Sequence, residues 1–324
     1  MKIAVIGGAG YIGSHTVREL LDGGHQVFVF DNLSSGLKQN LFPDAHFFHG
    51  DILNREDLAI FFNKVQPEGV VHLAALKAAG ESMTHPEKFS TQNIVGSLYL
   101  IQQAVASKVR YFVFSSSAAV YGAPQYNPID ENHPTNPENY YGYTKLSIEN
   151  HLAWYSRLKG LHFAALRYFN AAGYDPNSRI IGLESNPSNL IPVAMEALTG
   201  KRKELLIFGN DYQTPDGTGV RDYIHVTDLA VGHLMAFDYL KKQKQNLIVN
   251  LGTNEGASVL EIVQHAQQIT GKILPHRIVD RRPGDPDSLV ANPQKAMDIL
   301  GWQAKYSDLK TILETTWKAY QANL

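Results

Sequence analysis

The sequence predicts a doubly wound α/β fold, in which helices cover both faces of a parallel sheet, followed by a smaller C-terminal lobe. Two observations predict it. The first 31 residues have the pattern of a strand, a glycine-rich turn, a helix and a second strand, and short apolar runs then alternate with helical patterns as far as residue 168. Because the carboxyl ends of parallel strands meet at one edge of a sheet, a ligand site is expected beyond that edge.

The elements of this sheet follow in order along the chain. Six strands are expected over residues 2–6, 26–30, 46–48, 69–74, 110–114 and 162–168, which are short apolar runs. Helices are expected over residues 14–22, 55–65, 87–107 and 140–159, where apolar side chains recur at helical spacing. Asn54 and Pro86 mark helix starts, and Gly23 and Gly160 mark helix ends. A small-residue loop is expected over residues 75–83.

After Asn170 the pattern changes. Residues 171–189 are rich in Gly, Pro, Asn and Ser, so we predict a first domain over residues 1–171 and a second over residues 172–324, with some later segments returning to the first. The second half is expected to hold helices over 190–199, 222–241 after an extended entry, 258–269, 293–300 and 307–320, and a strand over 248–251.

Composition limits the class of protein. The 324 residues are 44% hydrophobic, enough for a full core, and the net charge of -2 with both signs mixed indicates no nucleic-acid or membrane-surface partner. The chain has no cysteine and its 13 histidines show no metal-ligand spacing, so no disulfide and no metal site are expected. The N-terminus does not resemble a signal peptide and no apolar run reaches the length of a membrane span, so a cytoplasmic location is expected.

The glycine-rich turn has the spacing of a dinucleotide-binding fingerprint. Gly7 allows a sharp turn out of the strand, Gly10 lets a pyrophosphate approach the backbone, and Gly13 lets the helix pack close to the strand. The first N–H groups of the helix and its dipole then face the phosphates. Asp31, at the end of the second strand, can accept both ribose hydroxyls and would repel a 2′-phosphate. The sequence therefore predicts NAD rather than NADP, the alternative being a glycine-rich turn without a ligand.

Tyr141 and Lys145 are four residues apart and so share one face of an expected helix. A tyrosine pKa of about 10 is too high for a base at neutral pH, but a fixed ammonium and a cationic nicotinamide would lower that pKa. Tyr141 could then take a proton from an alcohol while a hydride leaves the same carbon. Ser117 could hydrogen-bond the same oxygen, and Lys145 the nicotinamide ribose. Such a pair alone is common on surfaces, but its place behind the dinucleotide turn favours catalysis.

Longer motifs point to a family. They are GGAGYIGSH (7–15), DNLSSG (31–36), GDI (50–52), AALKAAGES (74–82), FSSSAAVYG (114–122), YYGYTK (140–145), LRYFNAAG (166–173), NLIP (189–192), FGNDYQTPDGTGVRDYIHV (208–226) and RRPGD (281–285). With these motifs the chain resembles, nearly end to end, the extended short-chain dehydrogenase/reductases, and among them the branch that epimerises nucleotide sugars.

The resemblance implies a fold, a cofactor and a reaction. The fold would be a Rossmann-type NAD-binding domain with a UDP-sugar-binding lobe, and NAD would stay tightly bound. The reaction would interconvert UDP-glucose and UDP-galactose by inverting C4 of the sugar through a 4-keto intermediate, with Tyr141 as the base. The family also suggests a homodimer, formed through the long helices over residues 87–107 and 140–159.

The resemblance also assigns cofactor contacts. Tyr11 and Ile12 would offer N–H groups to the pyrophosphate, Asp51 and Ile52 would meet the adenine, and Lys77 would reach the nicotinamide ribose. The full set is Gly7, Gly10, Tyr11, Ile12, Gly13, Asp31, Asn32, Leu33, Ser34, Ser35, Gly36, Asp51, Ile52, Leu73, Ala74, Ala75, Lys77, Asn93, Ser117, Tyr141, Lys145 and Phe169.

The substrate contacts that the resemblance implies lie mostly in the second half. Arg221 and Arg282 would neutralise the diphosphate, since an arginine fork suits phosphate oxygens, and Asp285 would accept from the uridine ribose. The full set is Ser117, Tyr141, Asn170, Asn189, Leu190, Leu206, Ile207, Phe208, Arg221, Arg282, Asp285 and Leu289.

Four positions depart from the family pattern. Ala119 stands where Thr is common, so Ser117 would serve alone; Leu73 replaces an aromatic residue and Ala75 a glycine. Leu289 falls where the family varies between Tyr and smaller residues, and a Tyr there narrows the pocket. Leu289 therefore leaves open whether UDP-GlcNAc and UDP-GalNAc are also accepted.

Three alternatives stay open. A nucleotide-sugar 4,6-dehydratase needs an acidic pair just after the fifth strand, where Ser115–Ala118 carries no carboxylate. A plain NAD-dependent sugar dehydrogenase would show net NADH production. A non-catalytic dinucleotide-sensing protein could share the fold, but it would not need Tyr141, Lys145 and Ser117 together with the two arginines.

Overall fold

A computed structural model describes residues 1–184, 187–282 and 285–324. Its centre is a seven-stranded parallel sheet in the order β10-β6-β5-β4-β1-β2-β3. The strands are β1 (Lys2–Ile6), β2 (Gln26–Asp31), β3 (His46–His49), β4 (Gly69–His72), β5 (Tyr111–Ser117), β6 (His162–Tyr168) and β10 (Leu247–Leu251). The chain builds outward from β1 in both directions, so the predicted doubly wound parallel sheet is confirmed, with its topological switch between β1 and β4.

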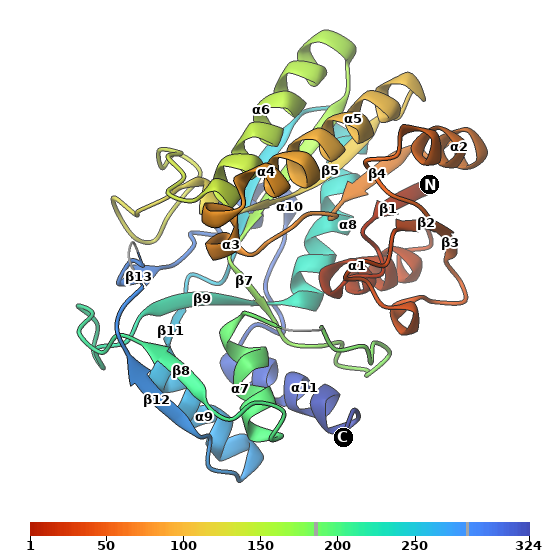
Figure 1. Ribbon diagram of the computed structural model, residues 1–324. Helices are drawn as coiled ribbons and strands as arrows, with labels where there is room; N and C mark the ends of the chain where they lie inside the picture. The colour runs from red at the N-terminus through yellow and green to blue at the C-terminus, as the bar shows by residue number, and fades with distance from the viewer. Residues whose placement is uncertain (185–186, 283–284) are drawn as a thin grey trace.

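Helices cover both faces of this sheet (Figure 1). One face packs against α1 (Tyr11–Asp22) and α8 (Val226–Gln243), and the other against α2 (Arg55–Val65), α5 (Gly96–Ala106) and α6 (Tyr140–Lys159). Side chains of β5 alternate between the two cores, with Val113 in the first and Phe112 and Phe114 in the second. A short helix, α10 (Gln294–Leu300), contacts α8 and β10. The later segments α8 and β10 thus pack with the sheet, while the domain division at residue 171 stays a prediction.

The second lobe lies below the carboxyl ends of the strands in Figure 1. Its helices α7 (Leu190–Leu198), α9 (Val259–Thr270) and α11 (Leu309–Gln321) share a third apolar core. Its short strands are β7 (Asn170–Ala172), β8 (Leu205–Phe208), β9 (Val220–His225), β11 (Gly256–Ser258), β12 (His276–Val279) and β13 (Ser288–Leu289). β9 pairs with β7, β11 and β13, and β8 pairs with β12. Strands far apart in sequence are therefore paired in two small sheets, one of four strands around β9 and one of two strands.

Two expectations need correction. The loop expected over residues 75–83 contains a helix, α3 (Ala79–Thr84), which packs on α6, where the buried Ser82 hydroxyl accepts a hydrogen bond of 3.0 Å from the Tyr141 N–H. The helix expected from residue 222 begins at Val226, because residues 220–225 pair as β9. In both places a tertiary contact overrides the local pattern.

The helix expected over residues 87–107 is present but not uniform. It consists of α4 (Pro86–Phe89), a π-helical turn η2 (Ser90–Val95) and α5. Two 3₁₀ turns, η1 (Lys38–Asn40) and η3 (Ala118–Val120), complete the elements. Among the described residues, no helix is long and apolar enough to cross a membrane. Four residues lie outside the described ones. They are Ser185 and Asn186, in the segment 171–189 that is rich in Gly, Pro, Asn and Ser, and Pro283 and Gly284 of the RRPGD motif.

Candidate active site

The glycine-rich turn joins β1 to α1 in the geometry that the three glycines predict. Gly7 has φ +86°, in the left-handed region. A Cβ on Gly7 would lie 2.7 Å from the Ala74 nitrogen, and one on Gly13 would lie 2.1 Å from the Gly7 carbonyl oxygen. Among the described residues no side chain caps the first turn of α1, whose N–H groups include Tyr11 and Ile12. This open cradle at a helix N-terminus fits a dinucleotide pyrophosphate.

Asp31 organises the next part of the crevice. Its carboxylate accepts hydrogen bonds from the Ala9 N–H (2.9 Å) and the Leu33 N–H (2.8 Å), and a Cβ on Gly36 would lie 2.9 Å from it. The 31–36 loop, with Ser34 and Ser35 exposed at its tip, is thus folded around this carboxylate. Asn32 donates to Asp51 (2.9 Å), next to the buried Ile52. These predicted adenosine contacts are brought together.

The loop after β4, residues 73–77, forms the opposite wall. Asn93 of η2 holds it: its amide oxygen accepts from the Leu76 N–H (2.8 Å), and its amide nitrogen donates to the Leu76 carbonyl (2.9 Å) and to Thr144 (3.1 Å). Asn93 therefore supports the loop that carries Leu73, Ala74 and Ala75, and direct contact with a cofactor stays a prediction. Lys77 forms an ion pair with Glu184.

The three predicted catalytic side chains come together at the carboxyl end of β5. Ser117 is its last residue, and Tyr141 and Lys145 project from the first turns of α6. The Lys145 Nζ donates to the Ser115 carbonyl (2.7 Å) and lies 5.7 Å from the centre of the Tyr141 ring. The Ser117 hydroxyl accepts a 3.2 Å hydrogen bond from the Ala119 N–H, and its effect on Tyr141 is to lower the pKa of the phenol. Asn139 caps α6 by accepting from the Gly142 N–H (2.8 Å), which fixes the start of the helix.

Ser117, Tyr141 and Lys145 together form what we call the catalytic wall. Burial dominates the electrostatics of this wall. It lowers the pKa of Lys145 to about 7, against the opposing effect of Glu149. Burial also raises the pKa of Tyr141, and the effect of Ser117 only partly offsets it. The expectation that Lys145 and a cationic nicotinamide together lower the pKa of Tyr141 concerns the protein with its cofactor bound, and it stays a prediction.

The predicted substrate residues of the second lobe line one cavity of about 520 Å³. They are Asn170, Asn189, Leu190, Leu206, Ile207, Phe208, Arg221, Arg282 and Asp285. Arg221 forms an ion pair with Asp285, and the Arg282 guanidinium lies 3.8 Å from the centre of the Phe208 ring. The cavity thus combines two guanidinium groups with an aromatic face, the groups that suit a diphosphate and a flat base.

Of the predicted substrate residues, Ser117, Tyr141 and Leu289 lie outside the lining of that cavity, as does the predicted cofactor residue Phe169. Phe169 and Leu289 both pack on the small apolar cluster of Ala118, Val120, Tyr121 and Ile129, directly after Ser117. Phe169 is followed by Asn170, which does line the cavity, and Ser117 is paired in register with Tyr168. The catalytic wall and the cavity are therefore adjacent, with Phe169 and Leu289 near their junction.

Sequence reasoning missed several residues of the cavity. Tyr212 lines it and donates a 3.3 Å hydrogen bond to Asp285, while the Arg281 guanidinium lies 3.8 Å from the centre of its ring. Arg202 and Tyr223 also line it. Tyr212 stands within the motif over residues 208–226 and could have been found there; nothing near Arg202 in the sequence signals a site.

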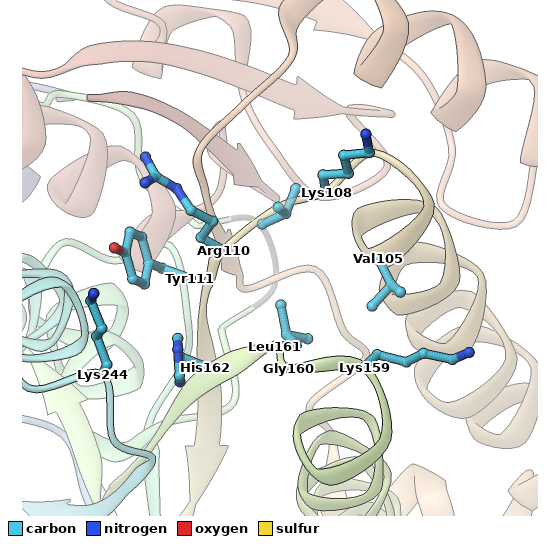
Figure 2. A pocket seen from close by; sticks show the side chains of 10 residues that line it. Val105, Lys108, Arg110, Tyr111, Lys159, Gly160, Leu161, His162 and Lys244 are labelled. Atoms are coloured by element: carbon cyan, nitrogen blue, oxygen red, sulfur yellow. The ribbon is translucent and has the colours of Figure 1, made fainter.

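A second hollow, of about 440 Å³, lies at the opposite edge of the sheet (Figure 2). It is lined at the first residues of β5 and β6, Tyr111 and His162, and carries Lys108, Arg110, Lys159 and Lys244. Arg110 is paired with Glu68, and Lys159 lies in the last turn of α6, where a cation suits the helix dipole. In Figure 2 the lysines point away from one another. Arg110 and Lys159 thus have structural explanations, and the cations of this hollow do not converge on one point.

Comparisons with known proteins decide the family. Residues 3–252 match the sequence model of the NAD dependent epimerase/dehydratase family. The chain belongs to the NAD-dependent epimerase/dehydratase family. The family predicted from the sequence motifs is thereby confirmed. NAD is the cofactor of this family, as the glycine-rich turn predicts.

Individual relatives in this epimerase/dehydratase family are similar over nearly the whole chain. The UDP-glucose 4-epimerase of Halalkalibacterium halodurans is 46% identical over 317 residues, which are 98% of this chain and 95% of that protein. The crystal structure of UDP-glucose 4-epimerase from Brucella ovis in complex with NAD has a TM-score of 0.96 at 43% identity, covering 98% of each chain. That of the Bifidobacterium longum enzyme in complex with NAD+ and UDP has a TM-score of 0.93 at 34% identity, covering 100% of this chain and 98% of that chain.

Proposed function

We propose that this chain interconverts UDP-glucose and UDP-galactose by inverting C4 of the sugar with bound NAD. The observation that carries the proposal is the adjacency of the wall of Ser117, Tyr141 and Lys145 to a cavity with two arginines and an aromatic face. The relatives named UDP-glucose 4-epimerase over nearly the full length support it.

Each side chain of the wall has a task in this reaction. NAD, when bound in the cradle, supplies hydride acceptance and return at C4. Tyr141 takes the proton of the C4 hydroxyl and later gives it back, as a general base and then a general acid. Ser117 hydrogen-bonds the same oxygen and orients it against Tyr141. Lys145, held by the Ser115 carbonyl, supplies positive charge to the Tyr141 oxygen and donors to the cofactor ribose.

The substrate lobe explains how inversion is possible. Arg221 and Arg282 would hold the diphosphate and Phe208 the uracil, so binding energy is concentrated on UDP. The sugar would face the apolar junction at Phe169 and Leu289, which offers few polar groups to fix its orientation. A 4-keto sugar held through UDP alone can present either face to the hydride donor.

One incubation tests the proposal against its rivals. Purified protein is mixed with UDP-galactose without added NAD, and the nucleotide sugars are separated while NADH absorbance is followed. UDP-glucose without accumulating NADH is expected. Net NADH on addition of NAD would indicate a dehydrogenase, and a 4-keto-6-deoxy product a dehydratase. Binding of NAD with no sugar turnover would favour a sensing protein.

Acceptance of N-acetylated sugars is a second, finer proposal. It rests on Leu289, which is half-buried in the cluster beside Ala118 and Phe169 and so lies near the expected sugar position. Leu289→Tyr adds bulk there and is expected to reduce turnover of UDP-GalNAc several-fold more than that of UDP-galactose. Absence of any UDP-GalNAc turnover by the unmodified protein would refute it.

We also propose a homodimer formed through α5 and α6. On α6 the side chains of Tyr143, Trp154 and Leu158 are 49%, 56% and 65% exposed and recur along one face of the helix. Trp154→Glu with Leu158→Glu is expected to halve the mass measured by light scattering. An unchanged mass would place the interface elsewhere. The cytoplasmic location stays a prediction, which cell fractionation tests.

A further inference from the structure

A buried ion pair lies directly behind the catalytic wall. Glu149 of α6 receives two parallel hydrogen bonds from Arg167 of β6, 2.9 Å from Nε and 2.6 Å from Nη2. Both side chains are at most 6% exposed. The Ser116 hydroxyl of β5 donates to the same carboxylate. Glu149 thus joins the helix that carries Tyr141 and Lys145 to the two strands that end at the site.

We call the group formed by Glu149, Arg167 and Ser116 the clamp, and it lies close to Lys145 along α6. Glu149 is one helical turn after Lys145, so the two project from one face of α6. Ser116, which Glu149 holds, stands between Ser115, whose carbonyl accepts from Lys145, and Ser117 of the catalytic wall. The negative charge of Glu149 favours the ammonium form of Lys145, against burial, which lowers the pKa of this lysine to about 7.

The clamp is itself held in place from the far side. The Arg167 guanidinium lies 4.9 Å from the centre of the Tyr121 ring, and the Tyr121 hydroxyl donates to the Asn250 side chain of β10 (2.7 Å). Arg167 therefore cannot follow a displaced Glu149 without losing its contact with the Tyr121 ring, which is tied to β10 through Asn250. A buried ion pair of this kind is weak evidence for stability, because desolvation offsets the attraction. A role in the reaction gives a reason for its presence.

We propose that Glu149 is a positioning residue of the reaction, which keeps Lys145 charged and aligned with Tyr141 and is itself fixed by Arg167 and Ser116. The proposal rests on the proposed function only for the role of Lys145. The other titratable groups around Lys145 are Tyr141 on α6, His72 on β4, and Arg167 and Tyr168 on β6. None of these four groups is a carboxylate, and the negative charge that raises the pKa of Lys145 comes from Glu149.

Glu149→Gln keeps the shape of the side chain and removes its charge. In this variant Lys145 should lose its proton at lower pH. The midpoint of the alkaline limb in the plot of kcat against pH should therefore move to lower pH by about one unit. The value of kcat at pH 7 should drop about fivefold, because the protonated fraction of Lys145 falls from about a half to about a tenth, while KM for UDP-galactose changes less than threefold, because the UDP contacts are distant. NMR titration of lysine selectively labelled protein, with Lys145→Met to assign the signal, should show the same displacement independently of turnover.

A double variant separates charge from folding. Glu149→Gln leaves Arg167 buried without a partner, so it can unfold the protein. Glu149→Gln with Arg167→Met removes both charges, and it should regain thermal stability while the Lys145 titration stays displaced. Ser116→Ala keeps the ion pair but removes one of the contacts that fix Glu149, so it should displace the titration less than Glu149→Gln does. Glu68→Gln breaks the ion pair with Arg110 at the other edge of the sheet and serves as the matched control.

The outcomes separate two roles. A displaced Lys145 titration in the single or the double variant, with parental behaviour in Glu68→Gln, supports the proposal. A parental titration and pH profile in a folded variant would overturn it and leave Glu149 as a structural clamp. Because the titration needs no sugar substrate, a wrong assignment of the reaction would leave this result intact.

Discussion

The catalytic wall and the cavity of the second lobe are built in opposite ways. Lys145 is 4% exposed, sits on a 20-residue helix, and has its charge state set by burial. The side chains of Arg221 and Asp285 are 15% and 32% exposed. Arg221 comes from the short strand β9, and Asp285 from the loop before β13. Burial therefore changes the proton affinity of Lys145 and Tyr141, whereas the cavity offers charged side chains that are partly exposed to solvent. This difference indicates that the wall governs the chemical step and the cavity governs binding.

The sharpest test of that contrast is Tyr141→Phe. Loss of the hydroxyl removes the general base, so kcat should fall by about 10³-fold. Binding of UDP, measured by calorimetry, should stay within about twofold, because no cavity residue is altered. A fall of less than tenfold in kcat would mean that another group moves the C4 proton.

Lys145→Met separates activity from stability within the wall. The folded pKa of Lys145 is about 7, below its ordinary value of 10.5, so the folded protein binds fewer protons between these pH values. The free energy of unfolding therefore carries a contribution that rises with pH from about 7 to about 10, by a few kcal/mol. The methionine variant should lack this rise and be inactive. Thermal unfolding of both proteins at pH 7 and pH 9.5 measures it, and equal pH dependence would contradict the lowered pKa of the buried lysine.

Arg221→Met is the counterpart in the cavity. A charge-assisted hydrogen bond to phosphate contributes about 1.5–3 kcal/mol, so KM for UDP-galactose should rise by about 10–100-fold. The value of kcat should change little, since Tyr141 is untouched. Arg221→Lys serves as the control that keeps the charge. If kcat fell as far as in Tyr141→Phe, the division between wall and cavity would be wrong.

The smallest effect is expected at Arg282→Met. This guanidinium is exposed and lies 3.8 Å from the centre of the Phe208 ring, and an exposed ion pair with a phosphate contributes only about 0.2–1 kcal/mol. KM should rise only about two- to fivefold. The salt dependence of KM should also weaken, since one exposed charge is gone. A rise as large as for Arg221→Met would show that Arg282 becomes buried when substrate binds.

The sheet with its glycine-rich turn and the cavity of the second lobe also differ in how much of each could be predicted from the sequence. The turn of Gly7, Gly10 and Gly13 was predicted with its geometry, because a strand, a turn and a helix over a few consecutive residues leave little freedom. The strands of the sheet were likewise predicted, since each is a local apolar run. Tyr212 was missed, because it joins the cavity only through the fold of a loop.

Local pattern determined the order of strands and helices, the cradle for NAD, the spacing of Tyr141 and Lys145, and the motifs that carry the family resemblance. Tertiary structure decided the rest. It formed α3 from a small-residue segment by packing it on α6. It set the pKa directions at Tyr141 and Lys145, and it placed Arg167 beside Glu149. The physical reason is that periodicity and turn chemistry act between near neighbours, whereas burial and ion pairing depend on residues that only the folded chain brings together.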